Sequence, residues 1–271
     1  MSQTIGFIGG GNMAQALVAS ILEKGLFTPQ AIWISDVRFD QLAHLRETYD
    51  IRFTQVNTEL TAAADIIVLC VKPQVLGSLL DEIAGSLRDD ALVISIVAGK
   101  TSRYILDRLG QVQLVRVMPN TPAMVGASAS GLFNATAPKK GLDAAISIFQ
   151  AVGTTAVVDN EDLMDAVTAV SGSGPAYFFL LMEEMIKTGV KLGLDEKAAA
   201  DLVIQTACGA ALLAQKGQQS SQTPEILRKN VTSPGGTTEA AVKIFQAAGF
   251  QSIVKDALTA ARDRGRELSA D

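Results

Sequence analysis

The residues best suited to hold a phosphate group follow the first apolar run of the chain, residues 5–8. Gly9, Gly11 and Ala14 fit the pattern G-x-G-x-x-G/A, and a helix-like stretch begins directly after the glycines. Gly9 permits a tight turn, Gly11 lets the backbone approach a pyrophosphate, and Ala14 lets the helix pack on the strand. The helix N-terminus adds amide donors and a favourable dipole. This spacing predicts a dinucleotide-binding turn.

Asp36 and Arg38 are placed to select between the two nicotinamide dinucleotides. Asp36 ends the second apolar run, in the region where an acidic residue holds the adenosine ribose of NAD. Arg38 can instead bind the 2′-phosphate of NADP, which the carboxylate of Asp36 would repel. The pair leaves NADH and NADPH both open, with Asp36 favouring NADH. A plain helix-capping role for Asp36 is the alternative.

Other candidate cofactor contacts follow later strands of the predicted sheet. Ligands of an open α/β sheet bind outside the carboxyl ends of its strands. We therefore expect Val71, Lys72 and Pro73, together with Ala98, to flank the nicotinamide half of the cofactor. Asn57 precedes a short helix on the adenine side. For Lys72 and Asn57, a solvated side chain without a ligand is the alternative.

A second polar cluster lies at residues 230–239 and leads into a helical pattern over residues 240–247. It offers small residues, backbone amides at a helix N-terminus and three nearby hydroxyl groups, which suit a carboxylate or another small anion. A plain N-cap at Thr237 or Thr238 is the alternative. The turn at residues 118–122 contains two prolines and is consistent with either an architectural or a catalytic role.

The elements that must position these residues are predicted by hydrophobic patterning. Up to residue 158, short β-branched apolar runs alternate with amphipathic stretches, which is typical of strands buried on both faces of a parallel sheet. The expected strands are 5–8, 32–34, 66–71, 92–97, 114–118, an edge strand around 130–133, and 155–158; the expected helices include 12–24, 102–109 and 142–152. The fold class is therefore α/β, with an N-terminal Rossmann-type doubly wound sheet.

After residue 160 the strand-like runs cease and the periodicity is helical to the C-terminus. We predict two domains: a dinucleotide-binding domain, 1–160, and an all-α domain, 161–271. Residues 177–182 are apolar on more than one helix face. Such a helix must be covered by its own domain or by another subunit, so burial between two subunits is our hypothesis.

Composition excludes several classes of function. His44 is the only histidine and lies in a charged helical stretch, so a multi-histidine metal site is impossible and no metal is predicted. Cys70 and Cys208 lie far apart in apolar segments typical of buried, inert thiols, which favours a reducing compartment. The net charge of −5, without a basic cluster, argues against a nucleic-acid partner.

The sequence carries no sign of a membrane or export signal. Its start has no basic, apolar leader, and no apolar run approaches the roughly 18 residues of a membrane span. We expect a cytoplasmic protein without a membrane partner.

Five motifs together resemble those of pyrroline-5-carboxylate reductases, in order and over essentially the whole chain. They are GGGNMA at 9–14, VKP at 71–73, MPNTP at 118–122, VSGSGPAY at 170–177 and SPGGTT at 233–238. The last two are far more specific than the glycine turn. The resemblance implies hydride transfer from NADPH or NADH to the C=N carbon of 1-pyrroline-5-carboxylate, which gives L-proline in the final step of proline synthesis. It also implies an all-α C-terminal dimerisation domain that intertwines two subunits, with decamers in some members.

The resemblance implies roles for individual residues as well. Thr238 would be the catalytic residue, because its hydroxyl would hydrogen-bond the ring nitrogen and supply or orient a proton. The candidate cofactor-binding residues are Ile8, Gly9, Gly10, Gly11, Asn12, Met13, Asp36, Arg38, Asn57, Val71, Lys72, Pro73 and Ala98, and the candidate substrate-binding residues are Asn230, Ser233, Gly236, Thr237 and Thr238.

Two positions depart from the family pattern. Some members place a glutamate before the position of Pro224 to accept the ring N–H, whereas this chain has glutamines and serines there. Many members have neutral residues at the position of Asp36, which puts a strong NADPH preference in doubt.

Two other functions fit parts of the pattern. β-Hydroxyacid dehydrogenases share the two-domain layout, but their G-x-G-x-x-x-K helix carries an acid/base lysine where this chain has Phe178. A regulator that binds NAD(P) without turnover would leave the cluster at 233–238 unexplained.

Overall fold

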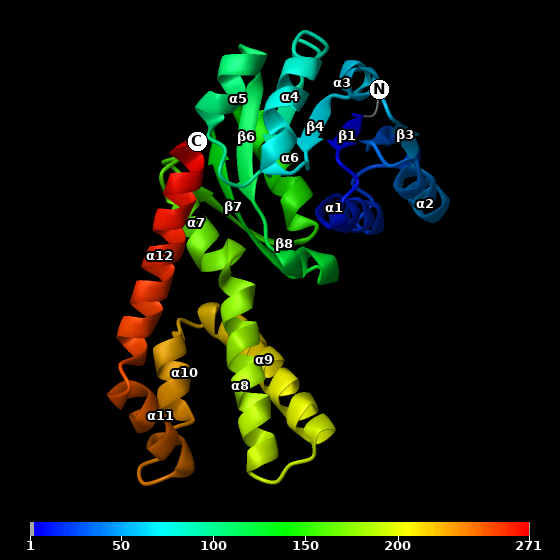
Figure 1. The fold of residues 1–271 in the computed structure, drawn as a ribbon. Coiled ribbons are helices and arrows are strands. Elements are labelled where there is room, and N and C mark those ends of the chain that lie inside the picture. Colours follow the sequence, from blue (N-terminus) through cyan, green and yellow to red (C-terminus); the bar gives the residue numbers. More distant parts are fainter. Residues whose placement is uncertain (1–2, 271) are drawn as a thin grey trace. The chain divides into compact units, whose positions relative to one another are not determined.

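The computed structural model describes residues 3–270, which form two compact units (Figure 1). An α/β unit runs to Pro175 and includes the chain again from Ala260, and a helical unit spans Ala176–Thr259. This division differs from the boundary predicted near residue 160. Helix α7 (Leu163–Val167) belongs to the α/β unit because Val167 packs on Gly131 of the sheet. The domain boundary at residue 160 is still our proposal, and it rests only on the change in sequence pattern at that point.

Within the described residues, eight strands form one sheet in the order β3-β2-β1-β4-β5-β6-β7-β8. The strands are β1 (Ile5–Ile8), β2 (Ile32–Ser35), β3 (Arg52–Thr54), β4 (Ile66–Leu69), β5 (Leu92–Ser95), β6 (Gln113–Met118), β7 (Ser128–Asn134) and β8 (Gly153–Val158). All neighbouring strands are parallel except β6 and β7. The strand order reverses at β1 and β4, and a doubly wound sheet binds its ligand at that point, outside the carboxyl ends. The predicted fold class is confirmed.

The prediction of an edge strand around residues 130–133 is wrong. That segment lies in β7, which pairs with β6 on one side and with β8 on the other. The burial of the strands explains the difference, because β7 is mostly buried whereas β8 has no buried residue and forms the edge. In addition, no strand was predicted at the position of β3, which is short and begins with the exposed Arg52.

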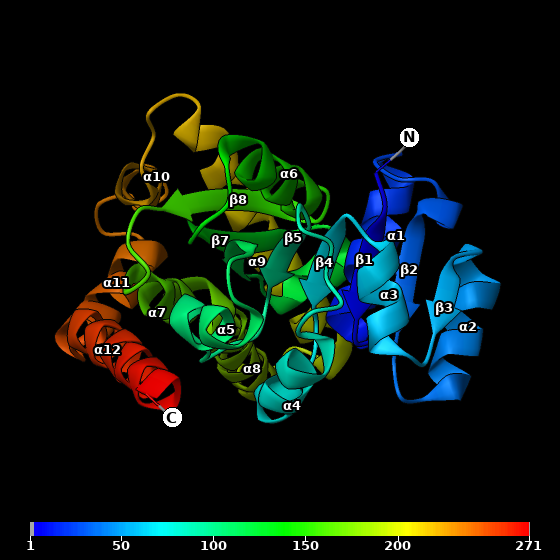
Figure 2. The same cartoon turned by 90° about the horizontal axis from the view of Figure 1, so that it is seen from above.

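Two apolar cores fill the two faces of the sheet. Figure 2 shows helices on both of these faces. The first is covered by α1 (Asn12–Glu23), α2 (Phe39–Tyr49) and α6 (Lys139–Gln150), and the second by α3 (Asn57–Ala63), α4 (Pro73–Ile83) and α5 (Ser102–Leu109). Successive strand residues point to opposite faces, so Phe7 joins the first core and Ile8 the second. Because both faces are buried, the strands read as continuous apolar runs.

The turn at residues 118–122 has an architectural role. Asn120 is buried, and its Oδ1 accepts hydrogen bonds from the Ser128 hydroxyl (3.1 Å) and the Ala129 N–H (3.0 Å). Its Nδ2 donates to the Ser171 carbonyl oxygen at 3.1 Å. Both ends of the amide are therefore occupied in tying β6 and β7 to the helical turn η3 (Thr168–Gly172). The remaining short turns are η1 (Pro29–Ala31) and η2 (Thr121–Val125).

The helical unit contains α9 (Glu196–Gln218), α10 (Pro224–Asn230) and α11 (Thr237–Ala247), most of α8 (Gly174–Lys191) and the first turns of α12 (Phe250–Ala270). Local signals set the helix starts. Asp195 caps α9 by accepting the Ala198 N–H at 3.0 Å, and Thr223 caps α10 by accepting the Ile226 N–H at 3.3 Å. Pro224 follows as the first helical residue of α10, a position that suits its fixed φ.

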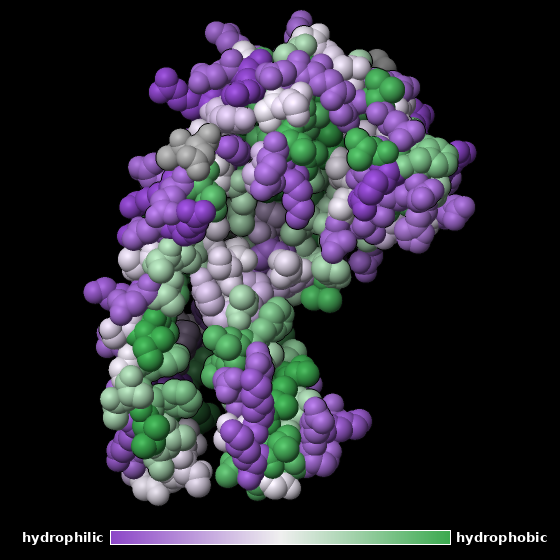
Figure 3. All heavy atoms as spheres, viewed as in Figure 1, coloured by the Kyte–Doolittle hydropathy of each residue, from purple (hydrophilic) through white to green (hydrophobic). Residues whose placement is uncertain are grey.

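Large apolar side chains of the helical unit are exposed in the single chain (Figure 3). They include Phe178, Phe179, Leu180, Leu202, Ile204, Leu212, Leu213, Ile244, Phe245 and Ile253. By length and composition alone, α9 could span a membrane, and only 6% of its most apolar 18-residue window is buried. The expectation that no segment would pass this test was wrong, because α9 interrupts its apolar residues with alanine, glycine and neutral polar residues rather than with many charges.

The two cysteines differ from each other. Cys70 is half-buried and lines the cavity beside the glycine turn, so its expected full burial is not observed, although burial raises the pKa of its thiol. Cys208 lies exposed on α9, so its expected burial is wrong for the single chain. His44 is exposed on α2, as the charged helical pattern predicts.

Candidate active site

Gly9 forms the tight turn that follows β1. Its φ is +102°, and a Cβ at this position would lie 2.7 Å from the Cys70 carbonyl oxygen. Its N–H donates a hydrogen bond to the Ser35 carbonyl oxygen at 2.7 Å, which ties the turn to the end of β2. The turn therefore requires glycine both for its backbone conformation and for its close packing.

The N-terminus of α1 is open to an anion. Gly11 is the N-cap residue, no side chain caps the helix, and its first turn holds no acidic residue. A Cβ at Gly11 would meet no described atom within 4 Å, so the space beside it is free. The first amide N–H groups of a helix have no partner within the helix, and a pyrophosphate can accept their hydrogen bonds. These residues fit the dinucleotide that the glycine pattern predicts.

Asp36 is held against the glycine turn. Its Oδ2 accepts the Gly10 N–H at 2.8 Å, and its Oδ1 accepts the Arg38 N–H at 2.9 Å and the Arg38 Nε–H at 3.1 Å. Burial raises the pKa of Asp36, but the hydrogen bonds from Arg38 and Gly10 outweigh burial and hold this pKa below its usual value. The N-cap residue of α2 is Arg38 and no side chain caps that helix, so Asp36 links the ends of β1 and β2 rather than capping α2.

The Arg38 guanidinium lies on the outer side of this carboxylate. The side chain of Arg38 is 60% exposed, whereas that of Asp36 is 10% exposed. A cationic group is thus the more accessible member of the pair. Because the carboxylate is already shared by four donors, the Gly10 N–H, the Arg38 N–H and the Nε and Nη2 groups of Arg38, its repulsion of a phosphate is weaker than the sequence alone suggests.

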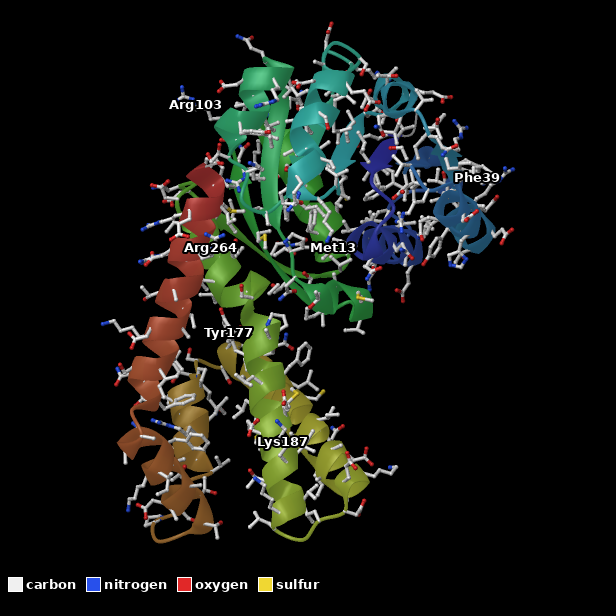
Figure 4. All side chains as sticks on the ribbon, viewed as in Figure 1. Met13, Phe39, Arg103, Tyr177, Lys187 and Arg264 are labelled. Carbon is white, nitrogen blue, oxygen red and sulfur yellow. The ribbon has the colours of Figure 1, made fainter. Side chains whose placement is uncertain are left out.

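A cavity of about 610 Å³ lies along the carboxyl ends of β1, β2 and β4. The predicted residues that line it are Ile8, Gly9, Gly11, Asp36, Arg38, Asn57, Val71 and Lys72. The other predicted cofactor residues do not line this cavity. Gly10 is buried within the turn, Asn12 and Met13 begin α1 (Figure 4), Pro73 begins α4, and Ala98 follows β5.

Asn57 and Lys72 differ in how firmly they are held. Asn57 accepts a hydrogen bond from the Ser35 hydroxyl at 2.8 Å and donates one to Glu82 at 3.0 Å. Lys72 is exposed at the start of α4, and among the described residues it forms no ion pair. Its ammonium group is therefore available to a ligand.

Sequence reasoning missed the part of the cavity that α4 supplies. Val75, Ser78, Leu79 and Glu82 line the cavity from one face of this helix, and Val37 lines it from the loop after β2. The four helical positions are spaced i, i+3, i+4 and i+7, which is the spacing of one helix face. That periodicity, applied to the helix after Val71-Lys72-Pro73, would have identified them.

The polar cluster at residues 230–238 forms the turn between α10 and α11. Gly235 has a φ of +73°, and its N–H donates to Glu239 Oε2 at 3.0 Å. The Gly236 N–H donates to the Ser233 carbonyl oxygen at 3.1 Å. Gly236 is the N-cap residue of α11, and no side chain caps this helix. The alternative that Thr237 or Thr238 is only an N-cap is therefore wrong.

The hydroxyl groups of this turn are not equivalent. The Thr232 hydroxyl donates to the Arg228 carbonyl oxygen at 2.6 Å. Within the part of the chain that the structure describes, the side chains of Asn230, Thr237 and Thr238 form no hydrogen bond with the protein. Thr238 is half-buried beside the uncapped start of α11. The turn thus combines free amide donors with a free hydroxyl, which suits a small ligand with a carboxylate and a second polar group.

The doubly wound sheet, the glycine turn at its switch point and a separate helical unit with its own polar turn define an NAD(P)-dependent oxidoreductase with a helical second domain. Residues 4–99 match the family model of NADP oxidoreductases, coenzyme F420-dependent, and residues 161–268 match that of pyrroline-5-carboxylate reductase dimerisation.

Relatives match over the whole chain. The pyrroline-5-carboxylate reductase of Pseudomonas aeruginosa is 45% identical over 98% of this chain and 96% of its own. The solved structure of the Coxiella burnetii pyrroline-5-carboxylate reductase is 39% identical over 99% of both chains, with a TM-score of 0.93. The Plasmodium falciparum pyrroline carboxylate reductase, solved with NADP bound, is 29% identical over 98% of both chains, with a TM-score of 0.86. This chain belongs to the pyrroline-5-carboxylate reductase family.

Proposed function

We propose that this chain reduces 1-pyrroline-5-carboxylate to L-proline, with NAD(P)H held by the α/β unit and the substrate held by the turn between α10 and α11. The observation that carries the proposal is the presence of two uncapped helix N-termini, one beside the glycine turn and one beside Thr238. A dinucleotide and a ring carboxylate are the two anions that this reaction brings together. When bound, NAD(P)H supplies the hydride.

On the cofactor side, the amide groups at the start of α1 bind the pyrophosphate, as the glycine turn permits. The cofactor residues proposed from the sequence keep that role: Ile8, Gly9, Gly10, Gly11, Asn12, Met13, Asp36, Arg38, Asn57, Val71, Lys72, Pro73 and Ala98. Asn57 is held in place by Ser35 and Glu82. Lys72, which is free of ion pairs among the described residues, contacts ribose hydroxyls.

On the substrate side, the amide groups at the start of α11 bind the carboxylate. Asn230, Ser233, Gly236, Thr237 and Thr238 form this half, and the Thr238 hydroxyl hydrogen-bonds the ring nitrogen and orients its proton. A protonated imine is already electrophilic, so the protein has chiefly to align the two reactants and exclude water. No histidine is required.

A single absorbance assay separates this function from its rivals. NADH or NADPH is incubated with 1-pyrroline-5-carboxylate, and the decrease of its absorbance is compared with that of a sample without substrate. NAD⁺ or NADP⁺ with a 3-hydroxyacid is the third sample. The proposal predicts a decrease only with 1-pyrroline-5-carboxylate. Reduction of NAD(P)⁺ by the hydroxyacid would support a dehydrogenase, although Phe178 stands where such an enzyme needs its lysine.

The assembly follows from the same family. Residues 161–268 match a dimerisation domain, and this region contains α9 and most of the exposed apolar side chains. We propose a homodimer in which these side chains are buried, in the cytoplasm and without a membrane partner. An assembly of several such dimers is the alternative. Analytical ultracentrifugation at micromolar concentration should show a dimer, and Ile204→Glu should shift it towards monomer. A wild-type monomer would contradict the proposal.

A further inference from the structure

The loop between β5 and α5 carries Ala98, which we place beside the nicotinamide half of the cofactor. Its next residue, Gly99, has a φ of +67°. A Cβ at Gly99 would lie 3.2 Å from the Cβ of Leu268 and 3.4 Å from the Leu268 carbonyl oxygen. The end of α12 therefore touches this loop with both its side chain and its backbone.

The same part of α12 makes a second close contact with the α/β unit. A Cβ at Gly265 would lie 3.1 Å from Asp165 Oδ1, which is tighter than ordinary van der Waals contact. Asp165 belongs to α7, so α12 packs on α7 and on the β5–α5 loop through residues only one helical turn apart (Figure 4 labels Arg264 on this segment). A glycine on each side of the joint permits this approach: Gly99 in the loop and Gly265 on the helix.

Charged groups surround this contact. Burial raises the pKa of Asp165, while Arg116 from β6 and Arg266 from α12 oppose that rise. Glu161 and Asp162 face the same carboxylate and repel it. Arg266 is therefore attracted to the site where Gly265 packs, which favours the docked position of the helix end.

Two of these charged residues, Glu161 and Arg116, also hold the end of the loop that leads into α5. The Glu161 carboxylate accepts the N–H and the hydroxyl of Ser102, both at 2.6 Å, and pairs with the buried Arg116. Ser102 is the first residue of α5, where the loop ends. The loop is thus fixed at its end by Glu161 and contacted at Gly99 by Leu268.

We infer that the last turns of α12, through Leu268 and Gly265, position the β5–α5 loop and so the nicotinamide side of the cofactor site. The inference rests on the proposed contact of Ala98 with the cofactor. It makes Leu268 a positioning residue, since it acts through Gly99 and Ala98. α12 begins at Phe250 in the helical unit, and its residues from Ala260 onward, which include Gly265 and Leu268, belong to the α/β unit.

Ligand binding to the purified full chain tests this inference without relying on turnover. Dissociation constants are measured for NADPH, by its fluorescence, and for 2′-phospho-ADP-ribose, which has the adenine half and pyrophosphate but no nicotinamide. Leu268→Ala should weaken NADPH about fivefold, which corresponds to about 1 kcal/mol, and should change 2′-phospho-ADP-ribose less than about twofold. Leu268→Met should restore NADPH binding.

Glu267→Ala is the matched control, because Glu267 lies on the same turn and, among residues 3–270, pairs only with the exposed Arg264. It should leave both dissociation constants unchanged. Equal weakening of both ligands by Leu268→Ala, or unchanged NADPH binding, would overturn the inference. A wild-type chain that binds NADPH but reduces no 1-pyrroline-5-carboxylate would instead overturn the proposed function and leave this comparison intact.

Discussion

The glycine turn after β1 and the polar turn before α11 both present an uncapped helix N-terminus, but their surroundings differ. The glycine turn is bound to neighbouring strands, by the Gly9 N–H on Ser35 and the Gly10 N–H on Asp36. The polar turn is mostly exposed, and its hydrogen bonds are local, such as that from the Gly235 N–H to Glu239. The proposed cofactor site is therefore held in place by hydrogen bonds to the sheet.

This difference indicates what each turn needs in order to work. Hydride transfer requires a site from which water is excluded. The glycine turn already adjoins a cavity lined by buried strands and α4, whereas the polar turn has to gain its cover from the ligand or from another subunit. Substitutions on the cofactor side should therefore change binding and stability, and substitutions at the polar turn should change turnover alone.

The largest effect is expected from Gly9→Val. The added side chain would meet the Cys70 carbonyl oxygen at 2.7 Å and would force an unfavourable positive φ. The dissociation constant of NADPH should rise at least about 100-fold, or roughly 2.7 kcal/mol. Gly25→Ala is the control, since Gly25 has a φ of +65° but meets no atom within 4 Å. It should lower stability slightly and leave NADPH binding unchanged; an effect equal to that of Gly9→Val would contradict the special role of the turn.

The next largest effect concerns stability and its pH dependence. Burial raises the pKa of Glu161, but hydrogen bonds from Ser102 and Arg116 outweigh it and hold this pKa below its usual value. A carboxylate whose pKa is lowered by folding stabilises the fold above its unfolded pKa, about 4.3, and this stabilisation is lost as pH falls through the folded pKa.

Glu161→Gln should therefore lower the free energy of unfolding at pH 7 by about 2 kcal/mol, because the buried Arg116 loses its charge-assisted hydrogen bond to the half-buried Glu161 carboxylate. The difference from wild type should shrink as pH falls below about 4. Urea denaturation at pH 7, 5 and 3.5 measures this. Asp165 acts in the opposite sense, since its pKa is raised, so Asp165→Asn should not reproduce the loss. A constant difference at all pH values would contradict the account.

On the other side of the comparison, Thr238→Ala should lower kcat at least about tenfold, or roughly 1.4 kcal/mol in the barrier. The dissociation constant of NADPH should stay within about twofold, because Thr238 lies on the polar turn, which we propose binds the substrate and not the cofactor. Thr238→Ser should restore most of the activity. Thr232→Ala, which removes a hydroxyl already bound to Arg228, should retain kcat. Unchanged kinetics in Thr238→Ala would remove Thr238 from the catalytic role.

The smallest effect is a change of cofactor preference. Asp36→Ser removes the carboxylate and frees the Arg38 guanidinium, so the ratio of kcat/KM for NADPH to that for NADH should rise about threefold to tenfold, or roughly 0.6–1.4 kcal/mol. Arg38→Ala should lower the same ratio. Because Asp36 also accepts the Gly10 N–H, both cofactors should bind somewhat less tightly to Asp36→Ser. An unchanged ratio would show that Asp36 acts only as a link between β1 and β2.

The sequence predicted the cofactor side more completely than the substrate side. Gly9, Gly11 and Ala14 follow a spacing that one physical arrangement explains, and Asp36 directly follows β2, the strand that pairs with β1. The hydrogen bond from Gly10 to Asp36 was beyond prediction, because it depends on how two strand ends meet. The contact between Leu268 and Gly99 could not be predicted either, because these two residues are far apart in the chain.

Residue patterns alone could not decide between an N-cap and a ligand site at Thr238, since both use the same residue types. The structure excludes the N-cap role, because Gly236 takes the N-cap position, and the ligand site at Thr238 stays a prediction. Similarly, apolar patterning predicted the existence of β7 but not its neighbours, because the pairing of β7 with β8 depends on a connection through α6.

The central claim is that a hydride passes from the cofactor bound by the α/β unit to the imine carbon of the substrate. The most direct measurement uses NADPH with deuterium at the transferable position of its nicotinamide C4, and locates the label in the product by mass spectrometry and NMR. The account predicts singly deuterated L-proline, with the deuterium on the nitrogen-bound ring carbon that does not carry the carboxylate, which is the former imine carbon. Oxidation of the cofactor with no deuterium in proline, or with the deuterium at another carbon, would contradict it.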